Sequence, residues 1–392
     1  MATAQIDLAT IQQIEQQGQI PFYGKREIAL VRGEGAYLFD SEGRRYLDAM
    51  SNYGVAVLGH ADQEFADALN DQLRTLTTGH QSFYSDVRAE ALEAISRVSP
   101  PGVPRAFLSN SGAEAIEAAL KMARLATGKT RAVALKRGYH GRTLGALSVT
   151  ADPKYRSPFE PLPFHATHVP FDDLDAVEAA IDDETGAVIL EPVQGEGGIW
   201  PASEAYLAGV REITSRRGVL LIVDEIQSGF RTGSPFVTVA AGVTPDIICT
   251  AKALANGFPV GLTLVTEAIS GTAGPGTHGS TFGGNPLACR AIVTTLNALE
   301  ERDLYARAVR LGADLVERIR DLNAAKVRAV RGSGLMIGID LKERVTPTLR
   351  ALQERGVLTL AAGNLTLRLL PPMIWTETQV DELLAVFEEV LN

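Results

Sequence analysis

The chain has 392 residues, with 37 basic and 47 acidic side chains and a net charge of −10. This acidic balance argues against nucleic acid as a partner, and a hydrophobic fraction of 45% excludes an intrinsically disordered chain. Two cysteines cannot build a disulfide framework, residues 1–24 contain neither Lys nor Arg, and no apolar run approaches the roughly 18 residues of a membrane span, so we expect a cytoplasmic protein with no membrane partner.

The first predicted element is a hairpin near the N-terminus. The runs Ala36–Asp40 and Arg45–Asp48 flank Ser41-Glu-Gly43, which has the composition of a turn. We expect these strands to belong to a smaller sheet.

A helix with a distinctive start is predicted next, over Ala115–Arg124. Ser111 and Glu114 form an S-x-x-E capping box before it, and Gly112 lets a ligand approach the backbone closely. The amides of a helix N-terminus suit a phosphate, although an ordinary capped helix has the same pattern.

Four short aliphatic runs with almost no polar alternation follow in the middle of the chain. Such runs are typical of strands buried on both faces of a parallel sheet, and they lie at Ala132–Leu135, Ala187–Leu190, Val219–Val223 and Asp246–Thr250. Between the second and third run, Ser203–Arg217 has apolar residues at helical spacing. These units predict the α/β class, with a doubly wound sheet.

Three of these strands are followed by ionisable side chains. Glu191, Asp224 and Lys252 stand at or just beyond the ends of the runs. Because ligands bind at the carboxyl ends of parallel strands, the three side chains together indicate a site, whereas one alone is ordinary in a solvated loop.

A stretch rich in glycine and hydroxyl groups precedes the next helix. In His278-Gly-Ser-Thr-Phe-Gly-Gly-Asn-Pro286, Asn285 suits the N-cap and Pro286 the first helical position. The hydroxyls of Ser280 and Thr281 suit a phosphate or carboxylate, although a plain turn has the same composition.

The C-terminal segment predicts a second domain. Val330–Leu341 and Leu365–Leu370 look like strands, and Thr376-Glu-Thr-Gln379 is a capping box before a helix. With the N-terminal hairpin, these elements predict an N-terminal segment (residues 1–60) that contributes to the small domain. They also predict a large α/β domain (61–290) and a C-terminal small α+β domain (291–392).

The motifs of several other functions are incomplete or absent in this sequence. Thr127-Gly-Lys-Thr130 resembles the end of a phosphate-binding P-loop, but Ala123 stands where its first glycine belongs. Gly332–Gly338 is one residue away from the dinucleotide fingerprint and opens a strand. The six histidines show no metal-ligand spacing, so we expect no metal site.

One chemistry uses Lys252, Asp224 and the helix start at Ser111 together. A lysine can form a Schiff base with a cofactor aldehyde, a carboxylate can keep a pyridine nitrogen protonated, and a helix N-terminus can hold a phosphate. Since the pKa of a free lysine is about 10.4, desolvation or a cationic neighbour must lower it.

From about Tyr23 to the C-terminus, the chain resembles the class III, ornithine/acetylornithine branch of the pyridoxal-phosphate aminotransferases. Six motifs carry the resemblance: Asn110-Ser-Gly-Ala-Glu-Ala115, Tyr139-His-Gly-Arg-Thr143, Glu191-Pro-Val-Gln-Gly-Glu-Gly-Gly198, Asp224-Glu-Ile-Gln227, Ala251-Lys-Ala-Leu254 and Gly279-Ser-Thr-Phe-Gly-Gly-Asn-Pro286. The resemblance implies fold type I of the pyridoxal-phosphate-dependent transferases and pyridoxal 5'-phosphate as cofactor.

The resemblance also implies roles in cofactor binding. Lys252 would hold the cofactor covalently and move the substrate proton, and Asp224 would pair with the pyridinium nitrogen. Gln227 would donate or accept a hydrogen bond at the ring hydroxyl, and Tyr139 would stack on the ring. The phosphate would be bound by Ser111, Gly112 and Ala113. Thr281 would contact the phosphate of the other subunit in a homodimer.

Substrate contacts follow from the same resemblance. Arg142 would bind a substrate carboxylate, and Glu196 and Arg368 resemble a gating pair that opens for the α-carboxylate of glutamate or 2-oxoglutarate. Positions that line the pocket in relatives are occupied by Tyr23, Tyr53 and Ser280, although simple packing also explains the tyrosines.

One motif departs from the family. Relatives read Gly-x-Gly-Arg-Thr-Gly after the Asp-Glu-x-Gln motif, whereas Gly229-Phe-Arg-Thr-Gly233 is one residue shorter. We expect this deletion to reshape a loop and to leave the chemistry in place.

These implications lead to one leading function. The enzyme would move the terminal amino group of N-acetylornithine, an N-acylated basic amino acid, to 2-oxoglutarate, giving the semialdehyde and glutamate. A carrier-protein-bound aminoadipate semialdehyde of lysine biosynthesis, free ornithine and 4-aminobutyrate stay open as alternative substrates. Lys121–Arg142 contains basic and no acidic residues, which suits an acidic carrier protein, although a solvated helix face has the same pattern.

Overall fold

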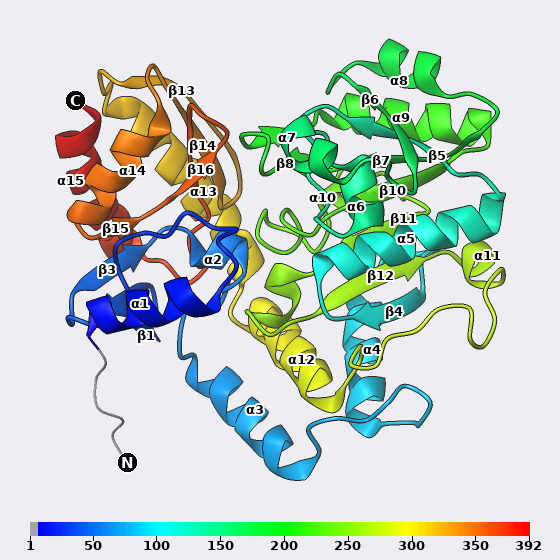
Figure 1. Ribbon diagram of the computed structural model, residues 1–392, viewed down its shortest axis with the longest axis horizontal. Coiled ribbons are helices and arrows are strands. Elements are labelled where there is room, and N and C mark those ends of the chain that lie inside the picture. The colour runs from blue at the N-terminus through cyan, green and yellow to red at the C-terminus, as the bar shows by residue number, and fades with distance from the viewer. Residues whose placement is uncertain (1–6) are drawn as a thin grey trace.

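The computed structural model describes residues 7–392, and a large seven-stranded sheet stands beside two smaller four-stranded sheets in it (Figure 1). The strands of the large sheet, in spatial order, are β4 (Arg105–Ser109), β12 (Gly261–Val265), β11 (Ile247–Thr250), β10 (Leu220–Asp224), β7 (Thr185–Leu190), β5 (Arg131–Leu135) and β6 (His165–Val169). Both pairings of β12 are antiparallel, while β10, β11, β7, β5 and β6 pair in parallel. The predicted α/β class with a mostly parallel sheet is confirmed.

Helices cover both faces of the large sheet because alternate side chains of its strands point to opposite sides. On β5, Ala132 and Ala134 belong to the cluster that includes α5 (Gly112–Thr127) and α6 (Leu144–Val149). Val133 and Leu135 belong to the cluster of α8 (Leu174–Ala180) and α9 (Glu204–Arg217). The strands are therefore buried on both sides, which explains their unbroken apolar runs.

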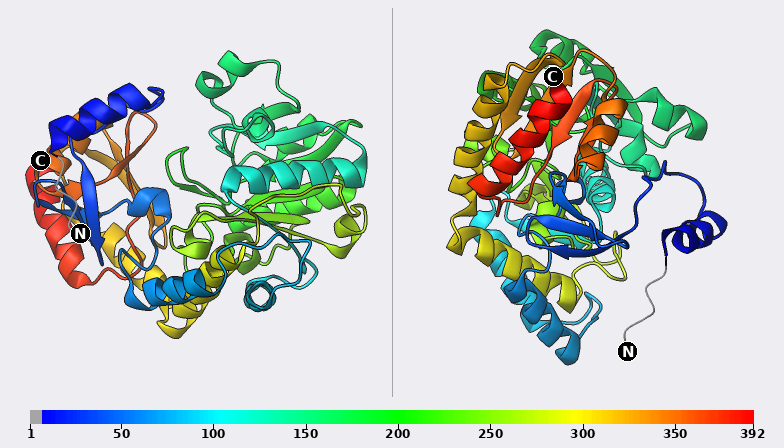
Figure 2. Two further views of the ribbon diagram at one scale, coloured as in Figure 1. Left: turned by 60° about the horizontal axis from the view of Figure 1, so that its bottom comes forward. Right: turned by 90° about the vertical axis from the view of Figure 1, so that its left-hand side faces the viewer.

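One of the two smaller sheets combines residues from both ends of the chain, and the other comes from the C-terminal part alone (Figure 2). One consists of β1 (Leu30–Glu34), β2 (Tyr37–Asp40), β3 (Arg45–Asp48) and β15 (Val357–Leu358). The other consists of β13 (Val327–Ser333), β14 (Met336–Leu341), β17 (Thr366–Leu369) and β16 (Leu360–Ala362). Since β15 pairs with β3 in parallel, the N-terminal hairpin and the C-terminal segment share a sheet.

The run Val330–Leu341 forms two strands rather than one. Gly334 has a φ of +50° in the turn between β13 and β14. A Cβ atom at Gly334 would lie 2.5 Å from the Cα of Thr232, so this turn packs directly on the loop that follows β10. The sequence pattern shows the apolar residues of both strands but not the long-range contact that fixes the turn.

The remaining elements connect and flank these sheets. They are α1 (Leu8–Gly18), α2 (Ser51–Gly54), α3 (Gln63–Thr75), α4 (Asp86–Val98), α7 (Pro153–Arg156), η1 (Ser157–Phe159), β8 (Val193–Gln194), β9 (Trp200–Pro201), α10 (Val237–Ala240), η2 (Lys252–Ala255), α11 (Glu267–Ser270), α12 (Pro286–Glu301), α13 (Leu304–Asp321), α14 (Val345–Glu354) and α15 (Glu377–Leu391). The predicted caps Asn285 and Thr376 begin α12 and α15, and Ser203, the first residue of the predicted helical stretch, is the N-cap of α9.

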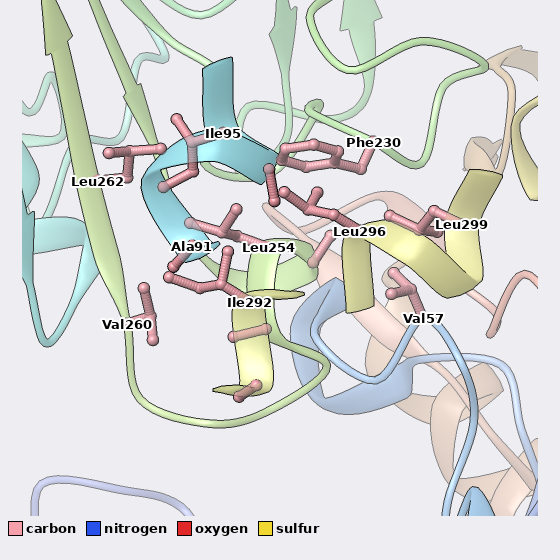
Figure 3. Close-up of a cluster of buried hydrophobic side chains, with 14 of the residues drawn as sticks. Val57, Ala91, Ile95, Phe230, Leu254, Val260, Leu262, Ile292, Leu296 and Leu299 are labelled. Carbon is pink, nitrogen blue, oxygen red and sulfur yellow. The ribbon is translucent and has the colours of Figure 1, made fainter. Parts of the chain in front are cut away.

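An apolar cluster anchors the segment that follows β11 (Figure 3). Leu254 of η2 is fully buried, and it lies among Ile95 of α4, Ile292 of α12 and Leu262 of β12. Burying one leucine side chain contributes about 1.5–3 kcal/mol. This burial fixes η2 at the carboxyl end of β11.

Within residues 7–392, no helix combines the length and the apolar character needed to cross a membrane.

Candidate active site

A cavity of about 430 Å³ lies at the carboxyl ends of β7, β10 and β11. Nine of the residues predicted for the site line it: Ser111, Gly112, Ala113, Tyr139, Arg142, Glu196, Asp224, Gln227 and Lys252. His140, Glu191, Asn52, Asn110 and Ile226 line it as well. Residues from these strand ends and from the N-terminus of α5 therefore line one cavity.

The N-terminus of α5 forms one wall of this cavity. Ser111 is its N-cap, and the Ser111 Oγ atom accepts a hydrogen bond from the Glu114 amide at 3.2 Å. In a capping box the Glu114 carboxylate would accept the amide of the N-cap, Ser111. It accepts the amide of Asn110 at 2.9 Å instead. A Cβ atom at Gly112 would lie 2.9 Å from Ile226 Cδ1, so only glycine lets the helix start approach this closely. The positive end of the helix dipole makes this wall suitable for a phosphate.

Asp224 is held by an imidazole at the end of β10. The His140 Nδ1 and Asp224 Oδ2 atoms lie 2.8 Å apart, and Asp224 Oδ1 accepts the amide of Ile226 at 3.0 Å. Burial lowers the pKa of His140, but the hydrogen bond and charge of Asp224 outweigh it and raise that pKa overall. Asp224 therefore favours the protonated form of His140.

Glu191 joins two loops that border the cavity. Its carboxylate accepts the amides of Tyr139 at 2.8 Å and Gly195 at 3.1 Å. Burial raises the pKa of Glu191. A Cβ atom at Gly195 would lie 2.0 Å from the Gln227 Oε1 atom, so Gln227 packs directly on this glycine.

Lys252 begins η2 immediately after β11, with a φ of +44°. Burial lowers the pKa of its amine to about 8. Because the neutral amine is the nucleophile, this shift brings Lys252 close to reactivity at physiological pH. The predicted need for desolvation is met by its position.

Arg368 belongs to β17 of a smaller sheet and contacts two residues that line the cavity. Its guanidinium is fully buried, and its Nη1 atom donates to Glu196 Oε1 at 2.7 Å and to Gln227 Oε1 at 3.1 Å. The Arg368 Nε atom has no hydrogen-bond partner among the residues described. The predicted pairing of Glu196 with Arg368 is present in the structure.

Arg142 lies at the mouth of the cavity, on two aromatic rings. Its guanidinium carbon is 3.7 Å from the ring centre of Tyr155 and 5.8 Å from that of Tyr139. Arg142 is exposed, so a ligand can reach its guanidinium.

Besides Arg368, four further predicted residues are not among those that line the cavity. The Tyr53 ring centre is 5.5 Å from the Arg368 guanidinium carbon, and Tyr23 is 81% exposed. Ser280 accepts a hydrogen bond from Asn110 Nδ2 at 3.0 Å, and Thr281 is exposed. Within one chain, Tyr23 and Thr281 are therefore exposed residues that do not line the cavity.

No role for His140 could be predicted from the sequence, and Glu191 was recognisable only as a carboxylate at a strand end. His140 stood inside the motif Tyr139-His-Gly-Arg-Thr143, but nothing in the sequence connected it with Asp224. The position of Glu191 at a strand end was the available signal, and its bonds to two loop amides give that position a structural role.

The shortened loop Gly229–Gly233 lies behind the site. Phe230 has a φ of +68° and is buried, and its amide donates to the carbonyls of Ser234 and Pro235. Asp224 and Gln227 still line the cavity in the presence of this loop.

These residues fit a phosphorylated pyridine aldehyde. A lysine with a lowered pKa, a carboxylate and a helix N-terminus line a single cavity, with aromatic Tyr139 on its wall. No group of three His, Cys, Asp or Glu side chains in the described part of the chain could hold a metal ion. Fold and site define a pyridoxal-phosphate-dependent enzyme of fold type I.

Comparisons with known proteins narrow this class. A family model for class-III aminotransferases matches residues 22–391. The LysW-aminoadipate semialdehyde transaminase of Deinococcus radiodurans is 44% identical over 374 residues, covering 94% of this chain and 87% of that protein. The acetylornithine aminotransferase of Methanopyrus kandleri is 42% identical over 94% of this chain and 96% of that protein. The chain belongs to the class-III aminotransferase family, and its cofactor is pyridoxal 5'-phosphate.

Solved structures agree. The ornithine aminotransferase of Toxoplasma gondii superposes with a TM-score of 0.93 at 29% identity, covering 98% of this chain and 94% of that one. The acetylornithine aminotransferase of Elizabethkingia anophelis gives a TM-score of 0.85 at 28% identity, with 98% and 99% coverage. The predicted fold type and aminotransferase activity are confirmed.

Proposed function

We propose that this aminotransferase moves the terminal amino group of N-acetylornithine, or a similar N-acylated basic amino acid, to 2-oxoglutarate. The observation that carries the proposal is that the Arg368–Glu196 pair lies beside the cavity that holds Lys252 and Asp224. Two different carboxylates must be recognised in turn, and the site offers two arginines at different positions for this task, Arg142 and Arg368.

Six further residues bind pyridoxal phosphate together with Lys252 in this proposal. Pyridoxal phosphate, when bound, supplies an aldehyde that joins covalently to an amine and a ring that accepts the electron pair released from the substrate. Lys252 Nζ attaches it and carries the substrate proton, and Asp224 keeps the pyridine nitrogen charged. Ser111, Gly112 and Ala113, at the start of α5, bind the phosphate. Gln227 forms a hydrogen bond with the ring hydroxyl, and Tyr139 stacks on the ring.

Substrate carboxylates are bound by two arginines, and one of these arginines exchanges Glu196 for the substrate. With Glu196 bound to Arg368, the α-carboxylate of the N-acylated donor pairs with Arg142, whose planar guanidinium suits a carboxylate. When glutamate or 2-oxoglutarate enters, its α-carboxylate replaces Glu196 on Arg368. Tyr53 and Ser280 border the space in which these exchanges occur, and Tyr23 is placed beside it by analogy with the family.

The active enzyme is a cytoplasmic homodimer in this proposal. Thr281 is exposed in one chain, beside Phe282, whose side chain is 63% exposed. A second copy that covers this segment would bury Phe282 and bring Thr281 to a phosphate in the partner's site. We also propose the domain division predicted from the sequence, with an N-terminal segment (residues 1–60), a large domain (61–290) and a C-terminal small domain (291–392).

A donor panel tests the proposal. Purified enzyme is assayed with 2-oxoglutarate as the common acceptor and with N-acetylornithine, ornithine, N-acetyllysine or 4-aminobutyrate as donor, and glutamate is quantified. N-acetylornithine is expected to give the highest kcat/KM. A preference for free ornithine or 4-aminobutyrate by more than tenfold would overturn the substrate assignment.

A second candidate is a donor that is joined to an acidic carrier protein. A further cavity of about 640 Å³ adjoins the site at Tyr139 and Glu196, and Lys136, Arg137 and Arg156 line it. Arg131, from the same basic stretch, is paired with Asp182 and is therefore neutralised. The remaining basic side chains beside the mouth of the site suit an acidic surface, and the relative from Deinococcus radiodurans is named for a carrier-linked substrate.

The variant Lys136→Glu/Arg137→Glu separates the two candidates. If the donor is carrier-linked, the charge reversal should raise KM for the carrier-linked amine about tenfold or more and leave KM for the free acylated amine unchanged. Equal kcat/KM for free and carrier-linked donors in the wild-type enzyme would remove the carrier from the proposal.

A further inference from the structure

The segment Ser51–Gly54 (α2) is a turn in the left-handed conformation. The φ angles of Ser51, Asn52, Tyr53 and Gly54 are +38°, +50°, +62° and +85°. Only glycine adopts this region without steric cost. The left-handed conformation of three consecutive residues with side chains is therefore unfavourable in free energy. Contacts elsewhere must stabilise the turn.

The start of the turn is fixed by the strand and loop on either side. Asp48 Oδ1 accepts the amides of Met50 at 3.0 Å and Ser51 at 2.8 Å. The amide of Leu370 donates to the carbonyl of Ala49 at 2.8 Å, and Ser51 Oγ donates to the carbonyl of Leu370 at 2.6 Å. Leu370 stands immediately after β17, so the turn is bonded to the chain that carries Arg368.

Arg231 provides the remaining support. It is fully buried, and its guanidinium donates to Ser51 Oγ at 3.2 Å and to the carbonyl of Leu335 at 2.8 Å. Its own carbonyl accepts the amide of Leu335 at 3.1 Å. A Cβ atom at Gly54 would lie 3.1 Å from Arg231 Nε. Arg231 thus joins the shortened loop after β10, the β13–β14 turn and the left-handed turn.

Burial lowers the pKa of Arg231, and the charge of the buried Asp48 carboxylate opposes this effect without an ion pair. In residues 7–392 its guanidinium forms no ion pair, and its Nε atom has no hydrogen-bond partner. A guanidinium stays charged at neutral pH, and burying an unpaired charge is costly. A hydrophobic residue would fill the same volume at lower cost, so stability alone does not explain an arginine at this position.

The turn presents two side chains to the substrate region. Asn52 lines the cavity, and the Tyr53 ring lies 5.5 Å from the Arg368 guanidinium. The surroundings of Arg368 when it exchanges Glu196 for a substrate carboxylate therefore depend on the position of this turn.

We propose that Arg231, acting through Ser51, is a positioning residue that holds the left-handed turn against Arg368 and thereby sets the affinity for the dicarboxylate substrate. The inference rests on the proposed function, in which Arg368 receives the α-carboxylate of glutamate or 2-oxoglutarate. The half-reaction of the N-acylated donor, in which Glu196 stays on Arg368 and Arg142 binds the carboxylate, does not require this positioning.

Two variants test the proposal, Ser51→Ala and Arg231→Lys. Each half-reaction is followed in a single turnover through the absorbance of the bound cofactor, once with glutamate and once with N-acetylornithine. The inhibition constant of glutarate, a dicarboxylate that cannot react, is measured in parallel. We expect both variants to raise the apparent Kd of glutamate and the inhibition constant of glutarate about tenfold, as the loss of a hydrogen bond to a charged group would. The Kd of N-acetylornithine should change less than threefold.

Arg307→Lys is the matched control. Arg307 also donates from a guanidinium to backbone carbonyls, those of Trp375 and Ile374, but it lies away from the cavity. The control should change neither half-reaction by more than threefold.

Equal losses in both half-reactions, or unchanged glutamate and glutarate affinities in both variants, would overturn the positioning role. If Ser51→Ala does not fold, Arg231→Lys alone decides between these outcomes. A wild-type enzyme that reacts with N-acetylornithine but takes no amino group from glutamate would refute the proposed function, and the inference with it, before any variant is compared.

Discussion

The Nδ1 atom of His140 lies 2.8 Å from Asp224 Oδ2, although the two residues are separated by 84 positions in the chain. Both side chains are almost fully buried, with 2% and 4% of their surface exposed. The imidazole holds the Asp224 carboxylate in place, and the charge of a carboxylate can stabilise a protonated pyridine nitrogen.

This relationship predicts the behaviour of Asp224→Asn. An amide cannot hold the pyridine nitrogen in its charged form, so turnover should fall at least about 10³-fold, the upper range for loss of one preorganised electrostatic contact. The cofactor should still bind, because the phosphate and ring contacts remain. Steady-state kinetics and cofactor absorbance measure the two effects, and near-normal kcat in this variant would refute the electron-sink role.

The lowered pKa of Lys252 predicts how cofactor attachment depends on pH. The neutral amine forms as the pH rises through about 8, the pKa to which burial brings this group. The rate at which apoenzyme takes up pyridoxal phosphate should therefore rise about fivefold from pH 7 to 8 and level off above about pH 9. A rate that still rises in proportion to hydroxide at pH 9.5, as for a lysine with an ordinary pKa, would contradict the assignment.

Gly195→Ala tests the packing of Gln227. The new Cβ atom would lie 2.0 Å from Gln227 Oε1, so the amide must move away from its position on the cavity wall. We expect the Kd of pyridoxal phosphate to rise about fivefold, as the loss of one buried hydrogen bond of about 1 kcal/mol would produce. Gly18→Ala, where no described atom lies within 4 Å of the added Cβ, should leave it unchanged.

Glu196→Ala tests the exchange of carboxylates on Arg368. Removing the carboxylate at 2.7 Å leaves the buried guanidinium free to bind a substrate carboxylate from the outset. KM for glutamate should fall, and the preference for N-acetylornithine over glutamate should drop about tenfold or more, in line with the loss of a buried charge pair. If kcat/KM falls by the same factor for both donors, Glu196 has no part in selecting the substrate.

The sequence identified the parts of the site that lie next to regular elements. Glu191, Asp224 and Lys252 could be placed at one edge of the sheet because buried parallel strands have a clear apolar pattern. Ser111 and Gly112 could be placed at a helix start because capping follows local rules.

The contacts that join distant segments could not be predicted in this way. No local pattern connects His140 with Asp224, or Arg231 with Ser51. The turn Ser51–Gly54 is the clearest case, since a left-handed conformation costs about 1–2 kcal/mol for each residue with a side chain. Its conformation depends on hydrogen bonds from Asp48, Arg231 and Leu370, which come together only in the folded chain.

Peptide mapping after borohydride reduction tests the central claim most directly. Holoenzyme is reduced, digested and analysed by mass spectrometry, with Lys252→Ala treated in the same way. We expect the mass of the reduced cofactor on the peptide that contains Lys252, and no labelled peptide from the variant. Stable attachment to another lysine in the wild-type enzyme, or none at all, would contradict the assignment of this residue.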